Sequence, residues 1–138
     1  MKLRIYTDGG ARGNPGPAAS AAVIKEVYKS GAEGNTIASV SRYLGIATNN
    51  QAEYTAVVIA LEKAKDLKAE TIEFYMDSEL AVMQLNGEYR VKNQELARLY
   101  LRIFELSHGI KKVSYRHIRR EQNAEADKLV NKCIDENL

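Results

Sequence analysis

Two aspartates stand at the ends of two expected strands, in Tyr6-Thr7-Asp8 and Tyr75-Met76-Asp77. Because side chains alternate between faces along a strand, each carboxylate shares a face with the tyrosine two residues before it. Adjacent strands are about 4.8 Å apart, so if the two strands are parallel neighbours, the carboxylates lie side by side at their carboxyl ends. Open α/β sheets bind their ligands at this edge, so the pair predicts a ligand site.

Two further carboxylates lie on the apolar stripes of expected helices. Glu53 is in line with Val57, and Asp127 is in line with Val130. We expect both to point inward, where a charge is costly unless it is paired or bound to metal. Four converging acids need a positive counterpart, and all-oxygen ligation favours hard divalent cations, Mg²⁺ first and Mn²⁺ second.

Each of these acids also has an ordinary structural interpretation. An aspartate at a strand end is commonly a turn residue or a helix cap. A glutamate in a first helical turn complements the helix dipole, and Asp127 could be a buried salt-bridge partner. Periodicity alone therefore leaves the joint site open.

The elements that would position these acids follow from hydrophobic periodicity. Strands are expected at Lys2–Thr7, Ala18–Tyr28, Thr36–Ile46, Thr71–Met76 and Val113–Ile118. A loop is expected at Gly9–Gly16, and a hairpin turn around Ser30-Gly31 and Glu33-Gly34-Asn35. Helices are expected from near Thr48, where Gln51 completes a capping box, and at Ser78–Leu85, Asn93–Ser107 and Ala124–Glu136. Three consecutive strands followed by alternating strands and helices predict an α/β fold with one mixed sheet.

Bulk composition fits one soluble domain. The chain has 138 residues, of which 45% are hydrophobic and 28% charged, and we expect a single domain over residues 1–138. No apolar run approaches the ~20 residues of a membrane span, and the start reads as a strand rather than a signal peptide, so we expect a cytoplasmic protein. The single cysteine, Cys133, excludes an intramolecular disulfide, and a net charge of +2 is too weak to indicate nucleic-acid binding.

Four motifs in order resemble those of type 1 ribonuclease H, and the resemblance covers essentially the whole chain. They are Tyr6-Thr7-Asp8-Gly9-Gly10 with Gly13-Asn14-Pro15-Gly16, Thr48-Asn49-Asn50-Gln51-Ala52-Glu53, Met76-Asp77-Ser78, and Asn123-Ala124-Glu125-Ala126-Asp127. Val91-Lys92-Asn93 also matches. The resemblance implies a ribonuclease H-like fold, a five-stranded mixed sheet with helices packed on both faces.

The resemblance also implies an activity, hydrolysis of the RNA strand of RNA–DNA hybrids to leave a 5′-phosphate and a 3′-hydroxyl. The family's catalytic and metal-binding acids carry over to Asp8, Glu53, Asp77 and Asp127. They would hold two Mg²⁺ ions about 3.5–4 Å apart, with Mn²⁺ as a possible substitute, and Asp8 would bridge the pair.

Substrate contacts carry over by position. Gly9, Gly10, Asn14 and Asn49 match residues that read the minor groove, where the 2′-hydroxyl distinguishes RNA from DNA. Thr48 matches a contact to a DNA-strand phosphate. For Thr48 and Asn49, helix capping is an equally simple interpretation, and the two roles are compatible.

The loop before the last acid departs from many relatives, which have a catalytic histidine there. His117 stands ten residues before Asp127, as that histidine would, but strand phase makes it a half-buried residue at a strand end. Arg120 is the better auxiliary catalytic candidate, because Arg120-Glu121-Gln122-Asn123 resembles a compact subgroup. It could orient the scissile phosphate or aid product release, or attract phosphate generally.

A basic, tryptophan-rich protrusion found in some relatives is absent. The chain has no tryptophan, and only Asn86–Arg90 separates the two middle helices. Hybrid binding would then fall to other basic residues, with steep salt dependence. The candidates are Arg12, Arg42, Lys92, Arg116, Arg119 and Arg120.

Two alternative functions remain open at this stage. Without the protrusion, and with Glu79 where many relatives have glutamine, the protein could also cut double-stranded RNA. It could instead be a non-catalytic hybrid-binding module, although such a module need not keep all four acids. We expect an RNA–DNA hybrid as partner, with double-stranded RNA as an alternative substrate, no membrane, and a monomer.

Overall fold

The computed structural model describes residues 1–138 and places five strands in one sheet, in the order β3-β2-β1-β4-β5. The strands are β1 (Lys2–Ala11), β2 (Gly16–Val27), β3 (Glu33–Ala47), β4 (Thr71–Met76) and β5 (Lys112–His117). β2 pairs antiparallel with both β1 and β3, whereas β4 runs parallel to β1 and β5 runs parallel to β4. The expected five-stranded mixed sheet is confirmed.

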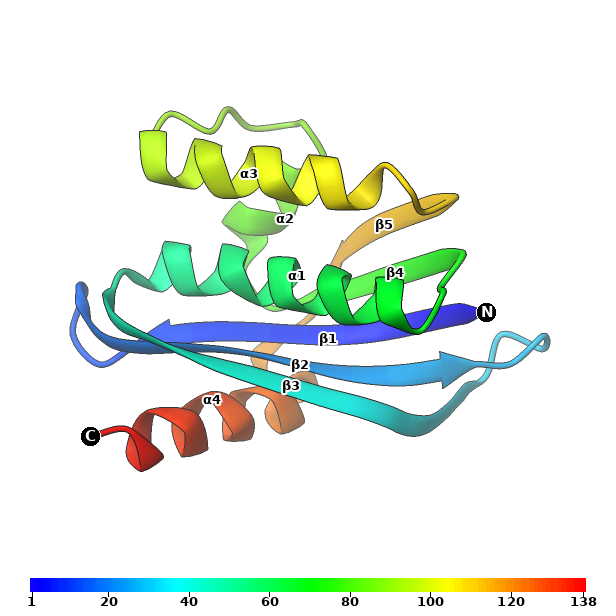
Figure 1. Ribbon diagram of the computed structural model, residues 1–138, viewed down its shortest axis with the longest axis horizontal. Helices are drawn as coiled ribbons and strands as arrows, with labels where there is room; N and C mark the ends of the chain where they lie inside the picture. Colours follow the sequence, from blue (N-terminus) through cyan, green and yellow to red (C-terminus); the bar gives the residue numbers. More distant parts are fainter.

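Four helices cover the two faces of this sheet. They are α1 (Asn49–Asp66), α2 (Glu79–Leu85), α3 (Gln94–Ser107) and α4 (Ala124–Glu136), with a short 3-10 turn η1 (Arg120–Gln122) before α4. Figure 1 shows α1, α2 and α3 on one side of the sheet and α4 alone on the other. Helices therefore pack on both faces, as expected. None of the four is both long enough and apolar enough to cross a membrane.

Several strand bounds differ from those expected, by one or two residues in β2 and β5 and by more at the end of β1 and the start of β3. The two larger differences arise because strand pairing extends through residues that resemble loops. β1 continues past Thr7, since Gly9 and Gly10 pair with Ser20 and Ala19 of β2. The hairpin turn is also shorter than expected, because β3 already begins at Glu33. Glycine weakens a strand when it stands alone, but a ladder partner supplies the hydrogen bonds that keep it extended.

The main core lies between the sheet and α1, α2 and α3. It is a cluster of 20 buried side chains, in which Leu3 and Ile5 of β1 and Ile72 and Phe74 of β4 supply the sheet side. The alternation expected for β1 and β4 is thus confirmed. Alanines on α1 let the helix lie close to the sheet, and the cluster holds the start of α1 over the carboxyl ends of β1 and β4.

The opposite face carries a smaller apolar cluster. Val130 and Ile134 of α4 pack on Ala19 and Ala21 of β2. Polar and aromatic side chains line the remainder of this face: the rings of Tyr6 and Tyr75 meet edge to face with centroids 5.4 Å apart, and Arg4 Nη2 donates to Glu73 Oε1 at 3.0 Å.

Candidate active site

Asp8 and Asp77 come together because β1 and β4 are parallel neighbours. The register pairs Tyr6 with Tyr75 and Thr7 with Met76, so each aspartate directly follows a paired residue. The expected parallel pairing is confirmed, but only Asp77 follows the end of its strand. Asp8 lies within β1, which continues to Ala11 along β2.

Glu53 is brought to this edge by the first turn of α1. The turn is fixed by the expected capping box: Gln51 N donates to Thr48 Oγ1 at 3.1 Å, and Thr48 N donates to Gln51 Oε1 at 2.8 Å. From the sheet, the fully buried Ser20 hydroxyl donates to the Ala52 carbonyl at 2.6 Å. Three side chains therefore set the position of the residue beside Glu53.

Gly9 is required by the closeness of β1 to α1. A Cβ on Gly9 would stand 2.2 Å from the carbonyl carbon and oxygen of Ala52 and 2.4 Å from the amide nitrogen of Glu53. Neither backbone segment can give way, since one lies in the sheet and the other in a capped helix. The glycine thus has a structural reason beside the substrate contact that the resemblance implied.

Asp127 was expected to point into the core, but it does not. Val130 and Ile134 are buried under α4, but Asp127 is exposed. It lies in the first turn of α4, where the helix reaches the edge of the sheet, so it faces the cavity at that edge rather than the apolar cluster.

All four acids line one cavity of about 240 Å³. Its lining residues are Asp8, Gly9, Gly10, Ala11, Arg12, Asn49, Glu53, Asp77, Arg120, Asp127, Val130, Asn131 and Ile134. Elements from both sides of the sheet contribute, Glu53 from α1 and Asp127 from α4. The residues are far apart in sequence, so the cavity is a product of the tertiary fold.

Burial and the closeness of the acids raise the pKa values of two of them. Burial raises the pKa of Asp8 from 3.8 to about 8, and the nearby charges of Asp77 and Asp127 add to the rise. Burial also raises the pKa of Glu53 from 4.5 to about 7, with Asp77 adding to the rise while Ser78 and Arg120 oppose it. Without a cation, the cavity therefore retains protons at pH values where exposed carboxyls have lost them.

The donor set fits a hard divalent cation. Glu53 Oε2 is buried and has no hydrogen-bond partner, which is costly for a carboxylate oxygen unless something positive approaches it. All donors are carboxylate oxygens, the ligands that Mg²⁺ and Mn²⁺ prefer. The protein alone does not hold three such side chains in coordinating positions at once, so ligation requires side-chain adjustment.

The substrate-contact candidates divide between two places. Gly9, Gly10, Arg12 and Asn49 line the cavity of the carboxylates. Asn14 and Thr48 line a neighbouring cavity of about 280 Å³ instead. The two places are linked, since Asn49 N donates to Asn14 Oδ1 at 3.1 Å and Ala11 N donates to Asn49 Oδ1 at 2.8 Å.

Several basic candidates are already paired with acids. Arg12 Nη1 lies 2.5 Å from Asp135 Oδ1, Arg42 bonds Glu62 at 3.1 Å, and Arg119 lies 3.4 Å from Glu121. Arg119 lines neither cavity. Arg116 lies over the Tyr75 ring, 5.6 Å from its centroid. The ion pairs lessen the charge that three of the six candidates, Arg12, Arg42 and Arg119, offer to a nucleic acid.

Arg120 and His117 differ in placement. Arg120 lines the carboxylate cavity, whereas His117 does not. His117 ends β5 and pairs with Met76, as strand phase indicated. It is exposed rather than half-buried, because β5 is the edge strand of the sheet and no element covers that position.

Ser20 is a residue whose contribution the sequence did not reveal. It lies within a run of small residues in β2, where nothing in the local pattern separates it from its neighbours. Only the tertiary contact with Ala52 gives it a role.

Comparisons with known proteins agree with this geometry. The family described as Reverse transcriptase-like matches residues 6–133. A ribonuclease HI of Halobacterium salinarum is 40% identical over 135 residues, covering 98% of this chain and 65% of that protein. A bifunctional protein of Mycobacterium tuberculosis is 38% identical over 135 residues, covering 98% of this chain. The chain spans only 36% of that longer relative.

Solved structures give the same result. The crystal structure of RNase H1 from Halobacterium salinarum superimposes with a TM-score of 0.88 at 39% identity, covering 99% of each chain. LC11-RNase H1 in complex with an RNA/DNA hybrid superimposes with a TM-score of 0.87 at 41% identity, covering 98% of each chain.

The sheet order, the helices on both faces and the acids at the carboxyl edge define a ribonuclease H-like domain. The identity to these relatives, 39% to 41% over nearly the whole chain, also assigns a family within this class of domains. The chain belongs to the type 1 ribonuclease H family.

Proposed function

We propose that this protein is a metal-dependent endonuclease that hydrolyses the RNA strand of RNA–DNA hybrids, leaving a 5′-phosphate and a 3′-hydroxyl. The observation that carries the proposal is the single cavity that Asp8, Glu53, Asp77, Asp127 and Arg120 line together. Family membership supports the reaction class, and the LC11-RNase H1 relative binds an RNA/DNA hybrid.

In this reaction a water oxygen forms a bond to phosphorus while the bond from phosphorus to the 3′ oxygen breaks. The water loses a proton and the leaving 3′ oxygen gains one. We assign the four carboxylates to two Mg²⁺ ions, or to Mn²⁺ in their place. When bound, such ions lower the pKa of the attacking water and stabilise the leaving oxygen.

The remaining side chains act on the substrate. Arg120 would bind the scissile phosphate, since it lines the cavity and its charge lowers the pKa of Glu53. Arg12 lines the same cavity but is paired with Asp135. The Gly9 and Gly10 backbone and the Asn49 side chain line the same cavity and would contact the minor groove. Contacts at the 2′-hydroxyl would select RNA over DNA.

The neighbouring cavity gives a further contact. Thr48 and Asn14 line it together with the start of α3, and we assign it to the DNA strand of the hybrid. Asn49 lines the first cavity and Asn14 the second, and a hydrogen bond joins them. The RNA strand and the DNA strand would therefore be held in a fixed relation to each other.

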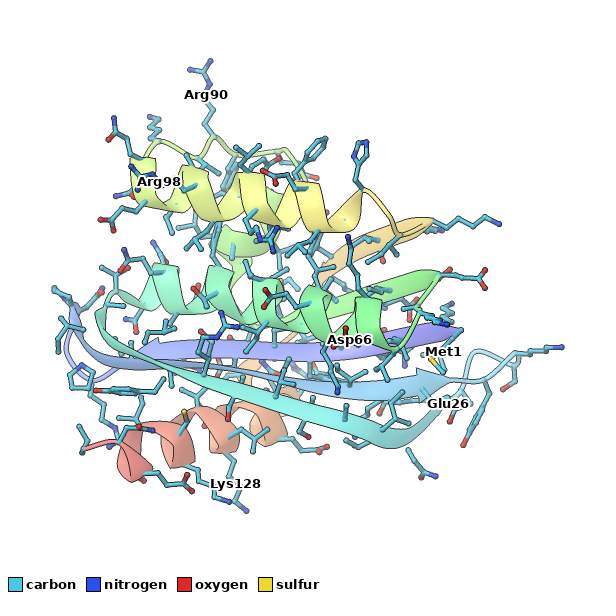
Figure 2. All side chains as sticks on the ribbon, viewed as in Figure 1. Met1, Glu26, Asp66, Arg90, Arg98 and Lys128 are labelled. Carbon is cyan, nitrogen blue, oxygen red and sulfur yellow. The ribbon has the colours of Figure 1, made fainter.

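The test is cleavage of a 5′-labelled RNA strand in a hybrid, with Mg²⁺ or Mn²⁺, comparing wild type with Asp77→Asn. Asp66→Asn is the matched control, because Asp66 is an exposed aspartate at the far end of α1, outside both cavities (Figure 2). We expect metal-dependent cleavage by the wild type and the control and a loss of at least about 10³-fold in Asp77→Asn.

The substrate panel includes double-stranded RNA, single-stranded RNA and double-stranded DNA. Cleavage of double-stranded RNA at a comparable rate would widen the activity to A-form duplexes. A pure wild-type protein that binds hybrid and cuts nothing with either metal would overturn the catalytic assignment in favour of a binding module.

A further inference from the structure

Asn123 is a deeply buried polar side chain near the carboxylate cavity, and the proposed reaction does not use it. It is 1% exposed and stands at the junction of η1 and α4. As the N-cap of α4 it would ordinarily bond its own helix through its side chain, yet it makes no such bond. The side chain is directed elsewhere.

The amide of Asn123 instead bridges two strands of the sheet. Its Nδ2 donates to the Thr7 carbonyl oxygen at 2.8 Å and to Asp77 Oδ2 at 3.3 Å. Thr7 directly precedes Asp8, so the first bond fixes the peptide unit that carries Asp8. The second bond holds the Asp77 carboxylate itself.

The backbone of Asn123 makes hydrogen bonds with the backbones of Asp127 and Arg120. Asp127 N donates to the Asn123 carbonyl at 3.1 Å, and Asn123 N donates to the Arg120 carbonyl at 2.9 Å. One residue thus connects the segments that carry Asp8, Asp77, Asp127 and Arg120. Glu53, held through Ser20 and the α1 capping box, is the carboxylate outside this set.

Such a connection is needed because four acids at one edge repel one another. Without a restraint, the Asp77 side chain gains by turning toward water and away from the other carboxylates. A neutral amide donor holds it in place without removing the negative charge that a cation needs. Groups that orient metal ligands in this way commonly change metal affinity or activity by about 10- to 100-fold when removed.

We propose that Asn123 is the positioning residue of the metal site, holding Asp77 and the end of β1 against the start of α4. The inference rests on the proposed function, since it assumes that these carboxylates bind a divalent cation. It assigns Asn123 no contact with the substrate, so its removal should change metal binding and leave hybrid binding in place.

The test is Mg²⁺ binding to the full chain by isothermal titration calorimetry, without substrate, for wild type, Asn123→Ala and Asn86→Ala. Asn86 is the matched control, because its Nδ2 also donates to a strand carbonyl, that of Tyr115 at 3.2 Å, but contacts no carboxylate. We expect Mg²⁺ to bind about 10- to 100-fold more weakly to Asn123→Ala and with wild-type affinity to Asn86→Ala.

Cleavage kinetics give the second measurement. In Asn123→Ala the Mg²⁺ concentration for half-maximal activity should rise by the same factor, while KM for the hybrid at saturating Mg²⁺ stays at the wild-type value. In an Asp77→Asn background, Asn123→Ala should weaken Mg²⁺ binding by less than it does in the wild type, because the carboxylate that it positions is absent.

The outcomes are separable. A folded Asn123→Ala protein with wild-type Mg²⁺ affinity would overturn the proposal and leave Asn123 a structural residue. If Asn123→Ala does not fold, Asn123→Leu, which has a similar side-chain volume but no donor, takes its place under the same criterion. A wild-type protein that binds no Mg²⁺ and cuts no hybrid would instead overturn the proposed function.

Discussion

The two faces of the sheet are joined to their helices by different means. On the α1 side, 20 buried side chains form one apolar cluster, whereas the α4 side has a cluster of four beside a layer of charged and aromatic residues. Glu53 comes from the first side and Asp127 from the second. Apolar burial therefore secures one half of the cavity, and a few directed polar contacts secure the other.

The largest expected effect is on stability, and it tests the difference between the two faces of the sheet. Leu61→Ala, in the large cluster, should lower the free energy of unfolding by about 4 kcal/mol, and Ile134→Ala, in the small one, by about 2 kcal/mol. Both side chains are buried, but α4 can shift to fill a cavity more easily than α1 can. Urea unfolding of both variants gives the values. Equal losses would mean that the two faces are equally rigid.

A change at the contact of β1 with α1 should act on catalysis. Gly9→Ala places a methyl group 2.2 Å from the Ala52 backbone, which displaces the turn that carries Glu53. We expect cleavage activity to fall by about 100-fold or more, since small misplacements of reacting groups cost that much.

Gly10→Ala is the comparison for this variant, because its new Cβ would meet only Val130 Cγ1, at 3.8 Å. Its loss of activity should be clearly smaller. If the two alanine variants behave alike, close packing is not the reason for glycine at position 9.

Metal removal should give the protein a pH-dependent stability. Asp8 and Glu53 have pKa values of about 8 and 7 in the fold, above their ordinary values of 3.8 and 4.5. A raised pKa stabilises the fold fully below the unfolded value, and this contribution is lost as pH rises through the folded value. With a chelator present, Tm should therefore fall between about pH 4 and pH 8.

Added Mg²⁺ should offset this loss, so that it raises Tm more at pH 8 than at pH 5. Asp8→Asn should flatten the pH dependence without metal, because it removes the group with the larger shift. A wild-type melting curve that stays level with pH in chelator would contradict the expectation.

The smallest expected effect lies in the polar layer on the α4 side. Tyr6 donates its hydroxyl proton to Glu33 Oε1 at 2.6 Å in an exposed contact. Tyr6→Phe should cost about 1 kcal/mol of unfolding free energy and leave cleavage unchanged. Chemical denaturation measures the first, and a loss above about 3 kcal/mol would show that this layer is more important than its exposure indicates.

Much of the fold could be predicted from the sequence, because local sequence patterns determine many of its helices and strands. Alternating strands such as β4 and the helix at Ala124–Glu136 have the expected bounds, and the capping box at Thr48 is present. The extension of β1 through Gly9 and Gly10 could not be predicted, since it depends on a partner strand rather than on the residues themselves.

The candidate site divides in the same way. Motif order and strand phase predicted that Asp8, Glu53 and Asp77 meet at one edge of the sheet, and all three line one cavity. The exposure of Asp127, the pairing of Arg12 with Asp135 and the contact of Ser20 with Ala52 follow from how α4 and α1 meet the sheet. No local pattern encodes those tertiary distances.

The turn between β2 and β3 lies at the opposite end of the sheet from the turn between β1 and β2 (Figure 1). It is closed by Tyr28 N donating to the Ala32 carbonyl at 3.0 Å. Ser30, within this turn, is exposed and forms no part of either cavity. Ser30 is therefore suited to a dye or a surface tether, through which single molecules could be observed while both cavities stay free.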